Sequence, residues 1–130
     1  MSEPIVFISR FRMKEGTRER FNDYARRVTA EIDAAKPRTL VYLAYLDDAA
    51  MRLTIIHAFG DAEAMDVHFE GAAERAAAAY EFIEPQGWEI YGRPSQGALD
   101  VMRRSAEAAG VSLTVLPDYL VGFLHSPSAG

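Results

Sequence analysis

The sequence predicts an α+β fold in which one antiparallel sheet carries helices on one of its faces. Some segments alternate between apolar and polar residues, as strands do, and longer segments repeat apolar residues at helical spacing. These segments follow one another in the order β-α-β-β-α-β. A chain of 130 residues is sized for one domain, with a core that needs no metal or disulfide support.

The first two elements are a strand and a long helix. The alternating pattern predicts a strand over residues 4–13, and Gly16 then breaks the pattern. Apolar residues next recur every three or four positions, which is typical of an amphipathic helix. Thr17 is the expected N-cap of this helix, and Pro37 is expected to end it.

A β-hairpin is expected next. Residues 40–46 and 52–59 are rich in β-branched, aromatic and aliphatic side chains, which favour strands. Asp47 and Asp48 lie between the two runs and favour a turn. The two runs should therefore pair with each other.

A second helix and a fourth strand complete the pattern. Asp61 is the expected N-cap, and a helical stripe of apolar residues continues as far as Ile83, with Gly71 expected to bend or divide the helix. A strand is expected over residues 84–93. Residues 1–93 thus predict a ferredoxin-like βαββαβ core with both helices on one face of the sheet.

Residues 94–130 form a C-terminal extension of the same domain. Ser95 is expected to cap a helix that Gly110 ends, and residues 112–116 are expected to form a further strand. The other face of the sheet has no helices in this fold, so its apolar residues need a second cover. We expect a homodimer, with the extension contacting the partner copy.

Composition excludes several classes of function. A net charge of −5 argues against nucleic acid as a partner, and no apolar run approaches the roughly 20 residues that span a bilayer. The chain has no cysteine and does not open like a signal peptide, which fits a cytoplasmic location. Phosphate-binding, hydrolase and metalloprotease motifs are missing, and we expect neither a metal site nor a cofactor.

Two histidines are the candidate catalytic residues. His68 lies three residues after Met65, at the edge of the core-facing stripe of the second helix, where an imidazole can take a proton from a phenol or an enol. His57 shares a strand face with Phe59. The residues alone favour a structural role for both rings, more strongly for His57, as a buried histidine hydrogen-bonded to the backbone.

The motifs around these histidines carry a resemblance to a known family. Residues 13–16, M-K-E-G, end the first strand, and residues 53–69 read L-T-I-I-H-A-F-G-D-A-E-A-M-D-V-H-F. A strand closing on Phe59, followed by Glu63-Ala64 and then His68-Phe69, resembles the antibiotic-biosynthesis-monooxygenase superfamily. The resemblance covers about the first 93 residues. It implies a dimeric α+β barrel, in which two ferredoxin-like subunits join their sheets.

The resemblance also implies a set of site residues. It places Ser9 and His68 in a cleft between sheet and helices, at positions where haem-degrading members carry asparagine and tryptophan, so haem is disfavoured. Many relatives have a glutamate on the third strand, where this chain has His57. The implied site has His68, or less favourably His57, as base, Ser9 and Tyr45 as hydrogen-bonding residues, and Phe7, Phe11, Phe69 and Trp88 as apolar walls.

The function implied by this resemblance is a cofactor-independent monooxygenase that acts on a small phenolic, quinol or enolic molecule. Such a substrate, once deprotonated, can itself pass an electron to dioxygen, so the protein need only remove a proton, hold the anion and exclude water. Two alternatives stay open. One is a non-catalytic dimeric module that binds a small molecule or stabilises a partner, and the other is an isomerase that shuttles protons between paired histidines.

Overall fold

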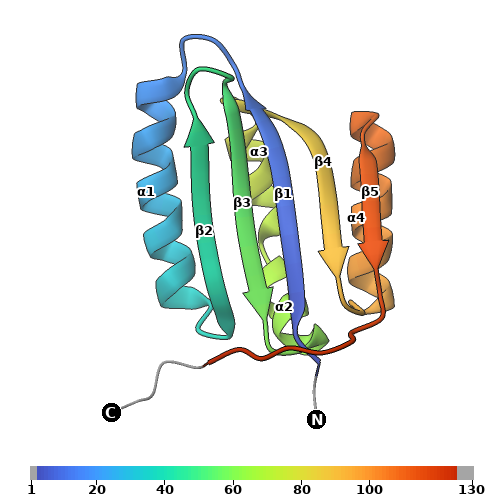
Figure 1. Cartoon of the computed structure of the whole chain (residues 1–130). Coiled ribbons are helices and arrows are strands. Elements are labelled where there is room, and N and C mark those ends of the chain that lie inside the picture. The colour runs from blue at the N-terminus through green and yellow to red at the C-terminus, as the bar shows by residue number, and fades with distance from the viewer. Residues whose placement is uncertain (1–2, 126–130) are drawn as a thin grey trace.

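The computed structural model describes residues 3–125 and shows a five-stranded sheet with helices on one face (Figure 1). The elements in chain order are β1 (Ile5–Met13), α1 (Arg18–Ala35), β2 (Thr39–Asp47), β3 (Arg52–Phe59), α2 (Ala62–Phe69), α3 (Ala72–Ala79), β4 (Ile83–Tyr91), α4 (Gln96–Ala109) and β5 (Ser112–Leu116). The strand order is β2-β3-β1-β4-β5. The first four strands pair antiparallel, and β5 adds to β4 in parallel. The expected α+β, ferredoxin-like arrangement is confirmed, with the extension contributing α4 and β5.

Local signals at most helix ends act as the sequence predicts. The Asp61 side chain accepts a hydrogen bond from the amide of Ala64, and Ser95 does the same for α4. Gly110 ends α4 in the left-handed conformation. Thr17 precedes α1 as expected, but its hydroxyl donates to the carbonyl of Lys14 at 2.7 Å and makes no cap to the helix. These caps fix where α2 and α4 begin over the sheet.

The helix expected to run as far as Ile83 is divided and shorter. Gly71 has a φ of +79°, which L-residues rarely adopt, and it separates α2 from α3. α3 ends at Ala79, so the expectation of a helix up to Ile83 is wrong beyond that residue. Ile83 instead begins β4 and pairs with Met13. A β-branched residue fits a buried strand at least as well as a helical stripe, and pairing with β1 decides between them.

The helix-bearing side of the sheet, here called the covered face, holds two apolar clusters. The first lies under α2 and α4 and contains Ile5, Phe7, Phe59, Ala64, Met65, Trp88, Ile90, Met102 and Ala106. The second lies toward the other end of the sheet and contains Phe11, Met13, Phe21, Leu53, Phe82 and Ile83. Alternation along β1 supplies both clusters, because successive side chains of a strand point to opposite faces.

The opposite side of the sheet, here called the open face, has no helix over it in Figure 1. Ion pairs join Arg10 to Glu89 at 2.5 Å and Arg12 to Glu84 at 2.8 Å across this face. The segment after β5, residues 117–125, runs along one end of the sheet without regular structure, and its Leu120 side chain is 91% exposed. Residues 126–130 of the extension lie outside the described residues. Within residues 3–125, none of the helices has the length and apolar character needed to cross a membrane.

Candidate active site

His57 lies in the middle of β3, on the covered face, between two aromatic residues of the neighbouring strands. The strand register places it opposite Phe7 of β1 and Tyr42 of β2. Its ring is 6% exposed, and Nδ1 donates a hydrogen bond to the carbonyl oxygen of Phe7 at 3.0 Å. A carbonyl can only accept, so Nδ1 carries the proton of the neutral ring and Nε2 keeps its lone pair.

His68 comes to the same place from the last turn of α2. It is 4% exposed, and its ring centroid lies 5.1 Å from that of His57 with the two ring planes at 76°. Thr39 Oγ1 at the start of β2 lies 2.7 Å from Nδ1 of His68. The structure therefore brings together two histidines from different elements, His57 from β3 and His68 from α2.

Burial keeps both imidazoles neutral. Loss of hydration lowers the pKa of His57 from 6.5 to about 4. Loss of hydration also lowers the pKa of His68 from 6.5 to about 3, and His57, Arg75 and Lys36 lower it further by charge repulsion. At neutral pH the site thus holds two uncharged rings that can each accept or donate a proton.

Two cations fix the end of α2 that carries His68. Lys36 Nζ donates to the carbonyl of Val67 at 2.8 Å, and the Arg75 guanidinium donates to the carbonyls of His68 at 2.6 Å and Glu70 at 3.1 Å. Cations are favourable at a helix C-terminus, where carbonyls lack helical partners. These contacts hold the position of His68 against the sheet.

The Nε2 atom of each ring is the nitrogen that no hydrogen bond to the described residues occupies. Neither Nε2 atom has a hydrogen-bond partner among residues 3–125. Every fully buried side-chain nitrogen or oxygen atom in that range does have a partner, so neither Nε2 atom is fully buried. The Nε2 atoms are therefore within reach of a water-sized molecule. They are the ring nitrogens of the pair that no described residue engages.

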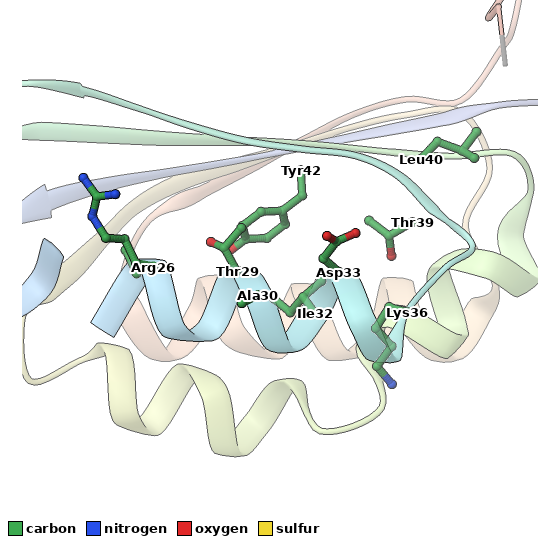
Figure 2. A pocket seen from close by; sticks show the side chains of 10 residues that line it. Arg26, Thr29, Ala30, Ile32, Asp33, Lys36, Thr39, Leu40 and Tyr42 are labelled. Carbon is green, nitrogen blue, oxygen red and sulfur yellow. The ribbon is translucent and has the colours of Figure 1, made fainter. Parts of the chain in front are cut away.

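An open groove of about 660 Å³ lies between α1 and β2. Arg26 and Asp33 come from α1, Lys36 directly follows that helix, and Tyr42 projects toward it from β2 (Figure 2). The inner wall includes Tyr42, whose ring centroid lies 5.1 Å from that of His57. Burial raises the pKa of Tyr42, so its phenol keeps its proton at neutral pH. Neither histidine lines the groove, but two residues that do, Tyr42 and Thr39, contact His57 and His68 respectively.

Four of the other expected site residues share the covered face with the pair. The Phe7 ring lies 5.0 Å from His57 and 5.6 Å from Phe69, between centroids. Ser9 is buried two residues farther along β1 and pairs with Trp88 of β4. The expected apolar walls and the serine thus lie on the same side of the sheet as the histidines.

Two expected residues lie away from the histidine pair, Phe11 on the same face and Tyr45 on the other. Phe11 belongs to the second apolar cluster, together with Phe21 and Phe82. Tyr45 pairs with Thr54, which places it on the open face, and it is 60% exposed. It therefore does not meet the histidine pair. The reason is geometric, because Tyr42 and Tyr45 differ by an odd number of positions and point to opposite faces of β2.

The sequence did not indicate the polar neighbours of His68. Thr39 precedes the expected strand and has no motif around it, and Arg75 sits in an alanine-rich helix. The strand period alone indicates that only one of Tyr42 and Tyr45 can face the helices. It does not say which one, because that depends on the pairing of β2 with β3.

Comparison with solved structures identifies the class of fold. The structure shares the fold of antibiotic-biosynthesis-monooxygenase-like proteins, which confirms at the level of fold the resemblance seen in the sequence. One of them, from Caulobacter crescentus, is named as a candidate antibiotic biosynthesis monooxygenase and matches with a TM-score of 0.60 at 15% identity, over 68% of this chain and 88% of that chain.

Two particular structures extend this comparison. MupZ from Pseudomonas fluorescens matches with a TM-score of 0.72 at 18% identity, over 98% of this chain and 100% of that chain. A mutant of SnoaB, a cofactor-independent oxygenase from Streptomyces nogalater, matches with a TM-score of 0.57 at 18% identity, over 71% of this chain and 93% of that chain. The match to MupZ includes the C-terminal extension. No protein-family model and no curated protein sequence matches the chain.

Proposed function

We propose that this protein is a cofactor-independent monooxygenase that acts on a small phenolic, quinol or enolic molecule. The observation that carries the proposal is the pair of neutral imidazoles, His57 and His68, with ring centroids 5.1 Å apart among aromatic side chains and with neither Nε2 atom hydrogen-bonded to residues 3–125. The shared fold with SnoaB, which is a cofactor-independent oxygenase, supports it. Fold alone does not determine activity, so the proposal depends on the site.

The chemistry needs only a base and a dry, shaped site. An imidazole takes a proton from an activated carbon or hydroxyl of the substrate, and the resulting anion passes one electron to dioxygen. The two radicals combine at carbon, and the peroxide loses water to leave a ketone. For an activated CH₂ group the balance is R₂CH₂ + O₂ → R₂C=O + H₂O, so the substrate supplies all the electrons.

The lone pair on Nε2 favours His57 as the base. The sequence favoured His68 for this role, but the hydrogen bond from Nδ1 of His57 to the Phe7 carbonyl leaves its Nε2 unprotonated and free to accept. The pKa of about 4 describes the ring without substrate. A substrate anion beside the protonated ring raises that pKa, because opposite charges within about 4–6 Å stabilise each other.

The proposal includes a homodimer built on the open face, as in a dimeric α+β barrel. Support comes from apolar residues there: half-buried Ile56 lies between half-buried Ile8 and exposed Leu43 across three paired strands. Residues 1–130 act as one domain, with the extension 94–130 against the partner. The absence of cysteine suits a cytoplasmic setting. Ile56→Glu should yield monomers in analytical ultracentrifugation, whereas the control Ala34→Glu, at an exposed position on α1 outside the extension, should not. Unchanged association of Ile56→Glu would contradict this interface.

The activity is tested by isotope labelling with a panel of anthrones, naphthalenediols and 1,3-diketones. Wild type should incorporate one atom of ¹⁸O₂ into product and turn over only in air. His57→Gln and His68→Gln should lose most of this activity, while His125→Gln, a histidine in the exposed segment after β5, should keep it. Activity that needs no oxygen, or that survives loss of both histidines, would remove the proposal.

The histidine pair itself favours a second candidate, an isomerase that moves a proton between two carbons of one substrate. Two imidazoles in contact, as His57 and His68 are, suit such a transfer. In D₂O an isomerase would place deuterium in the product without consuming oxygen, and a monooxygenase would consume oxygen. Tight binding of panel members without any product, unaffected by His68→Gln, would favour a non-catalytic binding module.

A further inference from the structure

Thr39 occupies a special position at the edge of the histidine pair. The pairing of β2 with β3 shifts register between Thr39 and Val41, so Thr39 stands at an irregularity and not in the regular ladder. Its amide donates to the carbonyl of Lys36 at 3.0 Å, which fixes the backbone just after α1. Its hydroxyl oxygen lies 2.7 Å from Nδ1 of His68.

The direction of this hydrogen bond decides where the proton of His68 resides. A hydroxyl can donate or accept, and a neutral imidazole carries one proton on either nitrogen. Among residues 3–125, Nδ1 of His68 is the acceptor that the Thr39 hydroxyl reaches. Donation from Thr39 uses the hydroxyl proton in this bond. Acceptance would leave that proton without a partner in the described part of the chain.

We propose that Thr39 is a positioning residue that donates to Nδ1 of His68 and so places the proton of that ring on Nε2. His57 carries its proton on Nδ1, where it donates to the Phe7 carbonyl. The two rings are therefore fixed as opposite tautomers: His57 presents a lone pair at Nε2, and His68 presents an N–H donor at Nε2.

Opposite tautomers define a chemical class of substrate, and this part of the inference rests on the proposed function. The proton moves from an acidic C–H or O–H of the substrate to Nε2 of His57, and the electron pair stays on the substrate. The Nε2–H of His68 donates a hydrogen bond to the oxygen on which that negative charge gathers. The site thus selects molecules whose acidic hydrogen is conjugated to a carbonyl or phenolic oxygen.

Nuclear magnetic resonance of ¹⁵N-histidine-labelled protein without substrate tests the tautomers directly. Ring nitrogen shifts distinguish a protonated from an unprotonated nitrogen, and single His→Gln variants assign the signals of the chain's three histidines. In wild type at pH 7, His57 should be protonated at Nδ1 and His68 at Nε2. Thr39→Val should shift His68 toward a mixture of tautomers and leave His57 unchanged, and Thr39→Ser, which keeps the hydroxyl, should restore the wild-type spectrum.

A wild-type His68 protonated at Nδ1, or a His68 spectrum that Thr39→Val leaves unchanged, would overturn the proposal. Since the spectra are recorded without substrate, these results do not depend on whether the protein is an oxygenase. With an active substrate, Thr39→Val should lower kcat roughly fivefold, the factor that one net hydrogen bond carries, with little change in KM and recovery in Thr39→Ser. An equal loss in Thr39→Ser and Thr39→Val would show that the hydroxyl plays no such part.

Discussion

The two faces of the sheet use the same strands for different purposes. On β1, Phe7 and Ser9 point to the covered face, whereas Arg10 and Arg12 point to the open face. The covered face holds its polar groups in low dielectric, where each needs a partner. The open face holds its charges as exposed ion pairs, which contribute little to stability.

This difference shows where chemistry can be built in this fold. A histidine on the covered face is neutral and aligned by a backbone carbonyl, as His57 is by Phe7. A tyrosine on the open face, such as Tyr45, is 60% exposed and is not aligned in this way. We therefore expect substitutions on the covered face to change stability or activity strongly, and substitutions of exposed charged residues on the open face, away from Ile56, to do so weakly.

The largest effect is expected from the apolar support of the pair. Phe59 is fully buried and its ring centroid lies 5.2 Å from that of His68. Phe59→Ala should lower the free energy of unfolding by about 3–5 kcal/mol, because it removes buried surface and leaves a cavity. Urea denaturation measures this. A loss below about 1 kcal/mol would mean that the covered face is not tightly packed around the histidines.

The second-largest effect is expected on activity, with a much smaller loss of stability. His57→Gln should lower kcat/KM by about 100-fold or more, since a positioned general base contributes about 10²–10⁴. The amide side chain retains a donor for the Phe7 carbonyl, so the fold should persist. Steady-state kinetics beside thermal unfolding separates the two effects. A variant that keeps full activity would place the base elsewhere.

The free energy of unfolding should depend on pH through the same two histidines. Folding lowers the pKa of His57 to about 4 and that of His68 to about 3, from 6.5. Below pH 6.5 the unfolded chain then binds more protons than the folded one, so the free energy of unfolding falls as the pH decreases. At pH 5 each histidine should reduce it by about 2 kcal/mol relative to neutral pH.

Urea denaturation between pH 7 and pH 5 measures this slope, and the His57→Gln and His68→Gln variants provide the comparison. Each substitution should flatten the slope of the free energy of unfolding against pH. The part of the slope that a variant loses comes from its histidine, and the part that both variants keep comes from carboxyl groups. The same slope in all three proteins would show that neither ring is kept neutral by burial.

The smallest effect is expected on the open face. Arg12→Gln removes the ion pair with Glu84, in which both side chains are largely exposed. The free energy of unfolding should fall by no more than about 1 kcal/mol, and kcat/KM should not change. A large loss of activity in this variant would mean that the two faces are not independent.

The sequence predicts the strands and the first helix well, because their periodicity and end signals agree. It places His57 on the face of Phe59, which the structure confirms. It misassigns Ile83, which fits a helical stripe and a strand equally, and it chooses Tyr45 where Tyr42 faces the helices. The contact of His57 with His68 requires α2 to lie over β3. No local pattern encodes that packing.

The most direct test is anaerobic mixing of the protein with an anthrone while the absorbance of the substrate anion is followed. Without oxygen the reaction should stop after proton transfer, so wild type should generate the anion and His57→Gln should not. Equal anion formation by both proteins would contradict proton removal by the buried histidine pair. Turnover in air by a wild-type protein that forms no anion under anaerobic conditions would contradict it too.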